Sequence, residues 1–289
     1  MRAEQEIINL ALNIAMQDER VRAVVLNGSR ANPNTHADIF QDYDIAFLVT
    51  EMESFWEDNR WIDVFGERMI LQMPEDMELF PAELDGSFTY LMQFIDGTRI
   101  DLALVPMEKE NEFFHGDSLT VLLLDKDNRA PDLPPPTDKD YLVKPPTAGM
   151  FADCCNEFWW VSIMVAKGLW RKETTYALES LNKLVRPMLF TMLEWQIGTR
   201  TEFSVNVGKF GKYLEKYLPE NCRQEFLSTF SRANDDEIWN ALFTACGLFR
   251  RTAIEVADHF GYLYPLEDDS RVSAFLLHIQ ELPPGALSF

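Results

Sequence analysis

The sequence predicts an α+β protein, with an N-terminal mixed β-sheet flanked by helices and a C-terminal α-helical bundle. Three observations in the 289 residues support this. Short segments rich in β-branched and aromatic residues occupy the first part of the chain, prolines then cluster between positions 131 and 146, and apolar residues afterwards repeat at helical spacing. We place the boundary in the proline-rich stretch, giving domains of residues 1–135 and 136–289.

The elements of the N-terminal domain follow from their periodicity. Residues 4–17 carry an apolar helical face, and residues 23–26 form an apolar run typical of a buried strand. In residues 42–49, β-prone residues at every second position alternate with Asp42 and Asp44, so both aspartates face the same side of a strand. Further strands are predicted at residues 68–72, 88–94, 99–105 and 119–124. An Asp96-Gly97 turn is expected to join two of them as a hairpin.

The C-terminal half has a helical pattern. Phe151, Cys155 and Phe158 begin one apolar stripe, which predicts a helix with a buried face. Three more stripes predict a bundle, and they include residues 178–192, 238–256 and 272–279. Pro187 should kink the first of these three, because proline cannot donate a helical hydrogen bond.

Composition narrows the class of protein. With 26 basic and 47 acidic residues the formal net charge is −21, which disfavours binding to nucleic acid or anionic membranes and favours a cationic substrate and a monomer. The N-terminus lacks an uninterrupted apolar centre and no membrane span is expected, which predicts a cytoplasmic location. The four cysteines have neither metal-ligand nor disulfide spacing, so we expect reduced core thiols.

Carboxylates inserted into apolar strands carry the predicted chemistry. Asp42 and Asp44 lie two residues apart, so their side chains point the same way, about 6.5 Å from each other. Asp101, framed by Ile100 and Leu102, can join them from a neighbouring strand. Unpaired carboxylates are costly to bury, and we interpret these three as ligands of Mg²⁺, which takes oxygen ligands and neutralises a nucleoside triphosphate during phosphoryl or nucleotidyl transfer.

A Gly-Ser turn precedes this carboxylate strand. Gly28 permits close backbone approach, and the Ser29 hydroxyl and nearby amides can hold phosphate oxygens. Arg30 adds positive charge. A Gly-Ser pair alone is most often an ordinary turn, but its place thirteen residues before Asp42 makes nucleotide binding the better interpretation.

The chain resembles the nucleotidyltransferase superfamily related to DNA polymerase beta, through its Gly-Ser turn, Asp-x-Asp strand and third strand carboxylate. A closer resemblance, to the aminoglycoside 6-adenylyltransferases that modify streptomycin, extends from Met1 to about Ile279. The segments that carry it are NGSRANP, FQDYDIAFLV, the FG in VFGERMILQMPE, DGTRIDLALVP, CNEFWWVSIMVAKGLWR and FSVNVGKFGKYL. The resemblance implies transfer of AMP from ATP to a streptomycin hydroxyl, with Asp42 and Asp44 as the metal-binding pair and Asp101 as a base, a metal ligand or both.

Streptomycin carries two guanidinium groups, so carboxylates and aromatic faces should recognise it. Asp153 and Glu157 lie four residues apart on one predicted helix, with Trp160 nearly one turn further on, and we predict that these residues bind the antibiotic. A solvated helix edge with tryptophans in the core is the alternative. Lys209 and Lys212 are candidates for phosphate contacts, although their GKFGK segment is not a P-loop and also suits a solvated helix start.

Two other functions stay open at this point. The chain can be a nucleotidyltransferase for another aminoglycoside or a lincosamide, with the same metal chemistry. Alternatively, it can be a noncatalytic module that binds a nucleotide or a partner, although the intact carboxylate set argues against this. The sequence does not decide which hydroxyl is modified or whether ATP is preferred over GTP.

Overall fold

The computed structural model describes residues 1–79 and 86–288. The chain forms two compact units, Met1–Asp140 and Tyr141–Phe289, which we describe separately. The division observed in the structure therefore lies five residues after the boundary that the prolines predict.

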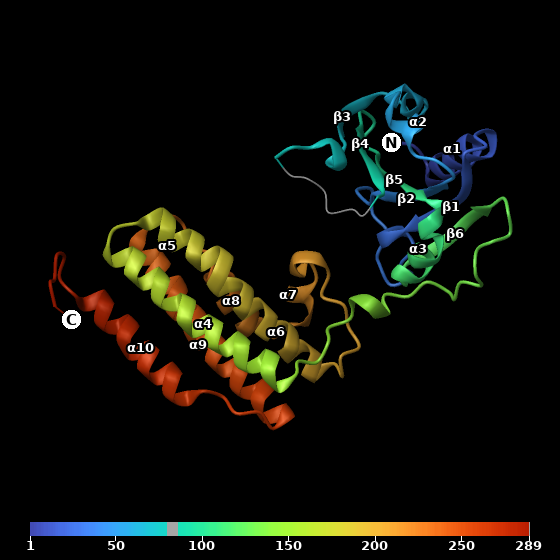
Figure 1. The fold of residues 1–289 in the computed structure, drawn as a ribbon. Helices are drawn as coiled ribbons and strands as arrows, with labels where there is room; N and C mark the ends of the chain where they lie inside the picture. Colours follow the sequence, from blue (N-terminus) through green and yellow to red (C-terminus); the bar gives the residue numbers. More distant parts are fainter. Residues whose placement is uncertain (80–85, 289) are drawn as a thin grey trace. The chain divides into compact units, whose positions relative to one another are not determined.

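The first unit is built on one sheet of six strands in the order β3-β4-β5-β2-β1-β6 (Figure 1). The strands are β1 (Val21–Asn27), β2 (Tyr43–Val49), β3 (Arg68–Gln72), β4 (Phe88–Phe94), β5 (Arg99–Pro106) and β6 (Thr120–Asp125). Strands β2 and β5 pair in parallel, whereas the other pairs are antiparallel. The predicted mixed sheet is thereby confirmed, and the turn at Asp96-Gly97 joins β4 to β5, with the Gly97 amide donating to the Phe94 carbonyl.

The two faces of the sheet differ in their covering. One face packs Ile45 and Phe47 of β2 and Leu102 of β5 into a large apolar core with α1 (Glu4–Gln17). Helix α2 (Glu53–Trp56) and the 3-10 segment Asn59–Phe65 complete that core. The opposite face carries a smaller cluster under α3 (Glu110–Gly116), which includes Ala46 and Leu48. Because strand side chains alternate, Asp44 lies on this second, less covered face.

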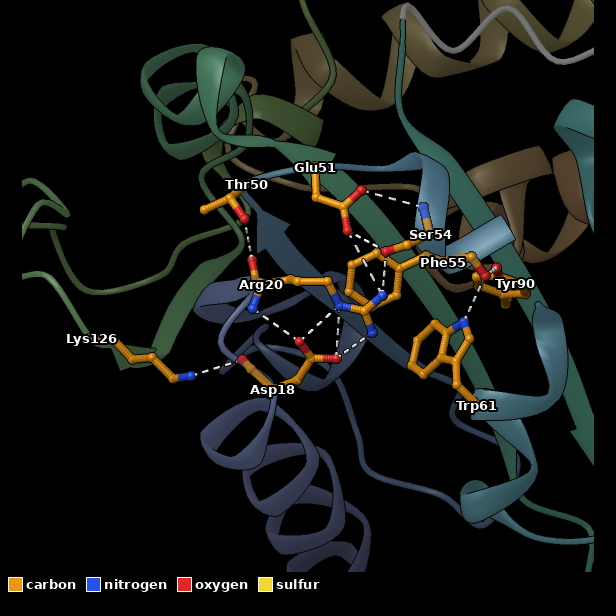
Figure 2. A network of polar contacts seen from close by, with 9 residues as sticks. All are labelled: Asp18, Arg20, Thr50, Glu51, Ser54, Phe55, Trp61, Tyr90 and Lys126. Atoms are coloured by element: carbon orange, nitrogen blue, oxygen red, sulfur yellow. Dashed lines mark hydrogen bonds and ion pairs between the residues drawn. The ribbon is translucent and has the colours of Figure 1, made fainter. Parts of the chain in front are cut away.

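Arg20 joins three elements at the edge of the first core (Figure 2). Its guanidinium donates to the Asp18 carboxylate, from Nε to Oδ1 at 2.9 Å, and lies 3.8 Å from the centre of the Phe55 ring. Phe55 belongs to α2, and its carbonyl accepts from Trp61 Nε1 and from the Tyr90 hydroxyl. The network therefore ties the end of α1 to α2 and to β4.

The second unit is helical throughout its regular structure (Figure 1). Its helices are α4 (Ala148–Trp170), α5 (Thr174–Ser180), α6 (Arg186–Arg200), α7 (Leu214–Tyr217), α8 (Glu220–Ser228), α9 (Asp235–Phe260) and α10 (Leu266–Glu281). A π-helical turn, Leu181–Val185, separates α5 from α6 directly before Pro187. Pro187 has no N–H with which to continue the helical hydrogen-bond ladder, and the π turn lies at this point of the predicted helix.

The structure also bears on the predictions for the four cysteines and for membrane-spanning helices. Cys154, Cys155, Cys222 and Cys246 are free and buried, as the sequence predicts. Burial raises the pKa of the Cys154 and Cys246 thiols to about 12. Among the described residues, none of the helices combines the length and apolar character that crossing a membrane requires.

Candidate active site

A row of polar side chains crosses four adjacent strands of the sheet. Asp44 on β2 is the register partner of Asp101 on β5 and, on its other side, of Asn27 on β1. Asn27 is in turn the partner of Thr120 on β6, and its Nδ2 donates to the Thr120 hydroxyl at 2.9 Å. Because direct partners point to the same face, this row places two of the three predicted carboxylates side by side.

The third carboxylate lies just before the strand. Asp42 precedes β2 by one residue, so the strand begins one position later than the sequence predicts. Its carboxylate lies 3.6 Å from Nε of Arg99, a residue that sequence reasoning did not single out. Arg99 also donates to both Asp101 oxygens, from Nε and Nη2, at 2.8 Å each. One guanidinium therefore bridges Asp42 and Asp101.

The electrostatics of this cluster show an excess of negative charge. The pKa of Asp44 is raised to about 6, first by burial and then by the charges of Asp101 and Asp42. Burial also raises the pKa of Asp42, against the opposing charge of Arg99. The hydrogen bond to Asp101 raises the pKa of Arg99. Asp44 thus has two carboxylate neighbours and no direct cation partner among the ion pairs of the described residues.

A hard divalent cation fits the chemistry of these residues. All three side chains offer oxygen ligands of the kind that Mg²⁺ takes, and a cation, the guanidinium, already lies on two of them. Within the described ranges, however, no group of three or more His, Cys, Asp or Glu is gathered closely enough to hold a metal ion. Magnesium binding by Asp42, Asp44 and Asp101 therefore stays a prediction.

The Gly-Ser turn lies directly beside Asp44. Residues Gly28–Arg30 form a 3-10 turn at the end of β1, and Gly28 has a φ of 69°. A Cβ on Gly28 would lie 2.9 Å from Asp44 Cγ and closer still to Oδ2. Only glycine allows this approach, so the turn and the carboxylate are in direct contact. Phosphate binding by Gly28 and Ser29 stays a prediction.

The guanidinium of Arg30 donates its hydrogen bonds to oxygen atoms of the protein. Its Nε donates to the Asp42 carbonyl at 3.0 Å, its Nη2 to the Gln41 carbonyl at 2.8 Å, and its Nη1 to Glu4. The guanidinium also stacks 3.7 Å from the Tyr43 ring centre. Arg30 therefore holds the backbone that leads into Asp42, and its role in nucleotide binding stays a prediction.

A cavity of about 450 Å³ adjoins Asp44 within the first unit. Ala46 and Ala103 are register partners two residues beyond the pair formed by Asp44 and Asp101, and both line it. Phe113 and Lys109 also contribute. The sequence analysis did not predict this cavity. The small side chains of Ala46 and Ala103, within the two predicted strands, were a signal for it.

The predicted antibiotic-binding residues all lie on α4 of the helical unit. Asp153 and Glu157 are exposed, and Trp160 is 67% exposed. Trp159 is buried, so the alternative of a solvated edge with core tryptophans holds for Trp159 but not for Trp160. Trp160 borders a cavity of about 520 Å³ together with Asn156 and Trp159. Antibiotic binding by these residues stays a prediction.

Lys209 and Lys212 lie in and next to the 3-10 turn Lys209–Gly211 of the helical unit. Both side chains are exposed, and their ammonium groups lie 5.6 Å from the Phe210 ring centre and 4.9 Å from the Tyr213 ring centre. Contact with a triphosphate stays a prediction for both.

The family model that matches this chain and the curated relatives of this chain describe adenylyltransferases. The family model described as streptomycin adenylyltransferase matches residues 1–279. The chain is 46% identical to an aminoglycoside 6-adenylyltransferase of Campylobacter jejuni, with 96% of each chain covered. It is 45% identical to one of Bacillus subtilis (strain 168), over 93% of this chain and 95% of that protein. A solved aminoglycoside 6-adenyltransferase structure from Bacillus subtilis aligns at 39% identity with a TM-score of 0.49, covering 98% of this chain and 100% of the other.

Proposed function

Because this chain belongs to the streptomycin adenylyltransferase family, we propose that it transfers AMP from magnesium-bound ATP to a hydroxyl of streptomycin, releasing pyrophosphate. The family is one of nucleotidyltransferase enzymes, and this chain is one of them. The resemblance stated from the sequence motifs is confirmed by these matches. Adenylylation of the antibiotic would confer resistance in the cytoplasm, where we expect the protein to act as a monomer.

The pairing of Asp44 with Asp101 is the observation that best supports catalysis. The two carboxylates lie on one face of neighbouring strands, and the pKa of Asp44 is raised by burial and by its acidic neighbours. Such a raised pKa in a cavity wall is typical of functional sites. A stable fold gains nothing from two adjacent carboxylates, whereas a site for a divalent metal ion uses them as ligands.

The reaction assigns a task to each carboxylate. Asp42 and Asp44 would hold Mg²⁺, with Asp101 as a further ligand. When bound, the ion supplies charge neutralisation to the triphosphate. The streptomycin hydroxyl oxygen forms a bond to the α-phosphorus, the bond from that phosphorus to the α–β bridging oxygen breaks, and pyrophosphate leaves with the electron pair. Asp101 would accept the hydroxyl proton and would also be a metal ligand, since both roles place it beside the same oxygen.

Recognition of the antibiotic would use the acidic character of the chain. The net charge of −21 attracts a cation at long range. On α4, Asp153 and Glu157 offer exposed carboxylates to the guanidinium groups, and Trp160 offers an aromatic face. Lys209 and Lys212 would supply positive charge to the phosphates.

Mass spectrometry of the antibiotic tests the proposal directly. The full chain is incubated with Mg²⁺, ATP and streptomycin, and we expect an antibiotic heavier by one AMP unit. Asp44→Asn should lose the product while keeping its fold, and Asp58→Asn, an exposed aspartate paired with Arg60, should keep it. Adducts on another aminoglycoside or a lincosamide but not on streptomycin would overturn the substrate assignment. A folded protein that modifies none of them would support the noncatalytic alternative.

A further inference from the structure

We propose that Arg99 is an internal countercation, which occupies the carboxylate site before the metal–nucleotide complex binds and is then exchanged for the metal. This rests on the proposed function, since it concerns the same carboxylates. Arg99 is thus a positioning residue that sets the metal affinity of the site.

The contacts of Arg99 coincide with the atoms that a metal would need. Its guanidinium donates to both oxygens of Asp101 at 2.8 Å and lies 3.6 Å from Asp42 Oδ2. Arg99 lies two residues before Asp101 on β5, so both side chains emerge on the same face of the sheet. A divalent ion on Asp42 and Asp101 would meet this positive charge at close range, and two cations on one carboxylate repel each other.

The positive charge of Arg99 cannot be removed by deprotonation. An arginine side chain stays protonated at any physiological pH. The guanidinium must therefore move away as the metal arrives. The side chain is 41% exposed, so it can leave without unpacking the core, and a pair this exposed to water is weak enough to exchange.

Asp44 is the carboxylate that has no ion pair with Arg99. It lies opposite Asp101, yet the ion pairs of Arg99 go to Asp42 and Asp101. One monovalent guanidinium thus pairs with two of the three neighbouring carboxylates. A divalent ion that also reaches Asp44 would gain an additional attraction that Arg99 does not make. Arg99 would hold Asp42 and Asp101 together before metal binds and would raise the metal concentration that half-saturates the site.

Binding of Mn²⁺ alone to the full chain, without nucleotide, tests this by electron paramagnetic resonance. With the competitor removed, Arg99→Met and Arg99→Gln should bind Mn²⁺ about tenfold more tightly than the unaltered chain, the range expected for a charge-assisted pair. Two substitutions are used so that a variant that fails to fold, judged by circular dichroism, does not decide the result.

Arg22→Met is the matched control. Arg22 donates in a two-pronged pair to Asp127 in the same unit, so its removal changes the net charge equally at a different place. Mn²⁺ affinity should not change there, and adding Asp44→Asn to Arg99→Met should abolish the gain. The proposal is overturned by folded Arg99 variants that bind Mn²⁺ no more tightly, or by an equal gain in Arg22→Met.

The two proposals fail in different ways. If the Arg99 variants show no gain while the unaltered chain still adenylylates streptomycin, the exchange alone is wrong. If the unaltered chain gives no adduct and no Mn²⁺ binding sensitive to Asp44→Asn, the metal-dependent function and the exchange are both wrong.

Discussion

Asp44 and Asp101 are direct partners in the parallel register of β2 and β5, and the neighbouring Gly28 has no side chain that would separate the turn from Asp44. The two carboxylates thus lie side by side on one face of the two central strands of the sheet. Central strands are held on both sides by hydrogen-bonded neighbours, so this arrangement cannot relax by moving one strand away. The repulsion between the Asp44 and Asp101 carboxylates is therefore a property of the folded state.

Asp44→Asn should stabilise the metal-free protein at neutral pH. The folded-state pKa of Asp44 is raised from 3.8 to about 6, so its contribution to stability is full below pH 3.8 and is lost as the pH rises through 6. Discounted for partial exposure, the loss is about 1–2 kcal/mol. We expect the variant to melt at a higher temperature than the unaltered chain at pH 8 in chelator, and the difference to vanish near pH 4.

Asp58→Asn controls for the loss of one negative charge. The pKa of Asp58 is lowered to about 2 by its hydrogen bond from Arg60, so its neutralisation should not raise the melting temperature. A pH-independent difference for Asp44→Asn, or a lower melting temperature at pH 8, would contradict the predicted repulsion.

Gly28→Ala should cost more stability than strain alone explains. The φ of 69° costs an alanine about 1–2 kcal/mol, and the new Cβ would also collide with the Asp44 carboxylate. Gly261→Ala is the matched control, because Gly261 has a φ of 70° with nothing within 4 Å of the Cβ position. Urea unfolding should show a larger loss for Gly28→Ala, and Asp44→Ala in the same chain should recover part of it. Equal losses for both alanines would show that the contact with Asp44 costs nothing.

The sequence predicts the sheet well because its strands carry local signals. The alternation around Asp42 and Asp44 gives both the strand and the face, and the six observed strands all overlap or match predicted ones. The short helices α2 and α3 have too few residues for periodicity to be visible. An apolar stripe is visible only in a long helix, which is why the sequence pattern predicts α4 and α9.

The side-chain partners could not be predicted in the same way. Arg99 looks like a solvated charge at the start of a strand, and only the parallel pairing of β2 and β5 brings it close to Asp42. The charge of Arg30 predicts a phosphate contact, which stays a prediction, but nothing local in the sequence shows that its guanidinium donates to the backbone carbonyls of Gln41 and Asp42. Such partners depend on residues distant in sequence, so charge alone cannot identify them.

Arg20→Met should destabilise the first unit by removing the centre of the network in Figure 2. Arg20 binds Asp18 and stacks on Phe55, and losing such a charge-assisted contact costs about 1–2 kcal/mol when it is partly exposed. The hydrogen bond from Arg20 lowers the pKa of Asp18, so this stability is present above pH 3.8 and is lost as the pH falls through the folded-state pKa. Thermal melts should therefore show a difference at pH 7 that shrinks in acid.

Arg60→Met tests whether the position of the pair matters. Arg60 donates to Asp58 with the same two-residue spacing as Arg20 and Asp18, but its side chain is 85% exposed. Its replacement should leave the melting temperature nearly unchanged. A loss as large as that of Arg20→Met would mean that stacking on Phe55 contributes little.

Asp269→Ala should loosen α10 in the helical unit. Asp269 is 3% exposed and accepts from Arg250 on α9, from the Tyr264 hydroxyl at 2.7 Å and from Ser273 at 2.9 Å. Burial alone would raise its pKa, but these hydrogen bonds lower it. Removing the carboxylate leaves three donors without their shared acceptor, at a cost of about 2–3 kcal/mol because Arg250 is partly exposed. Hydrogen exchange should accelerate across Leu266–Glu281, whereas Asp268→Ala, at the exposed neighbouring position, should leave it unchanged; equal protection in both variants would show that Asp269 does not anchor the helix.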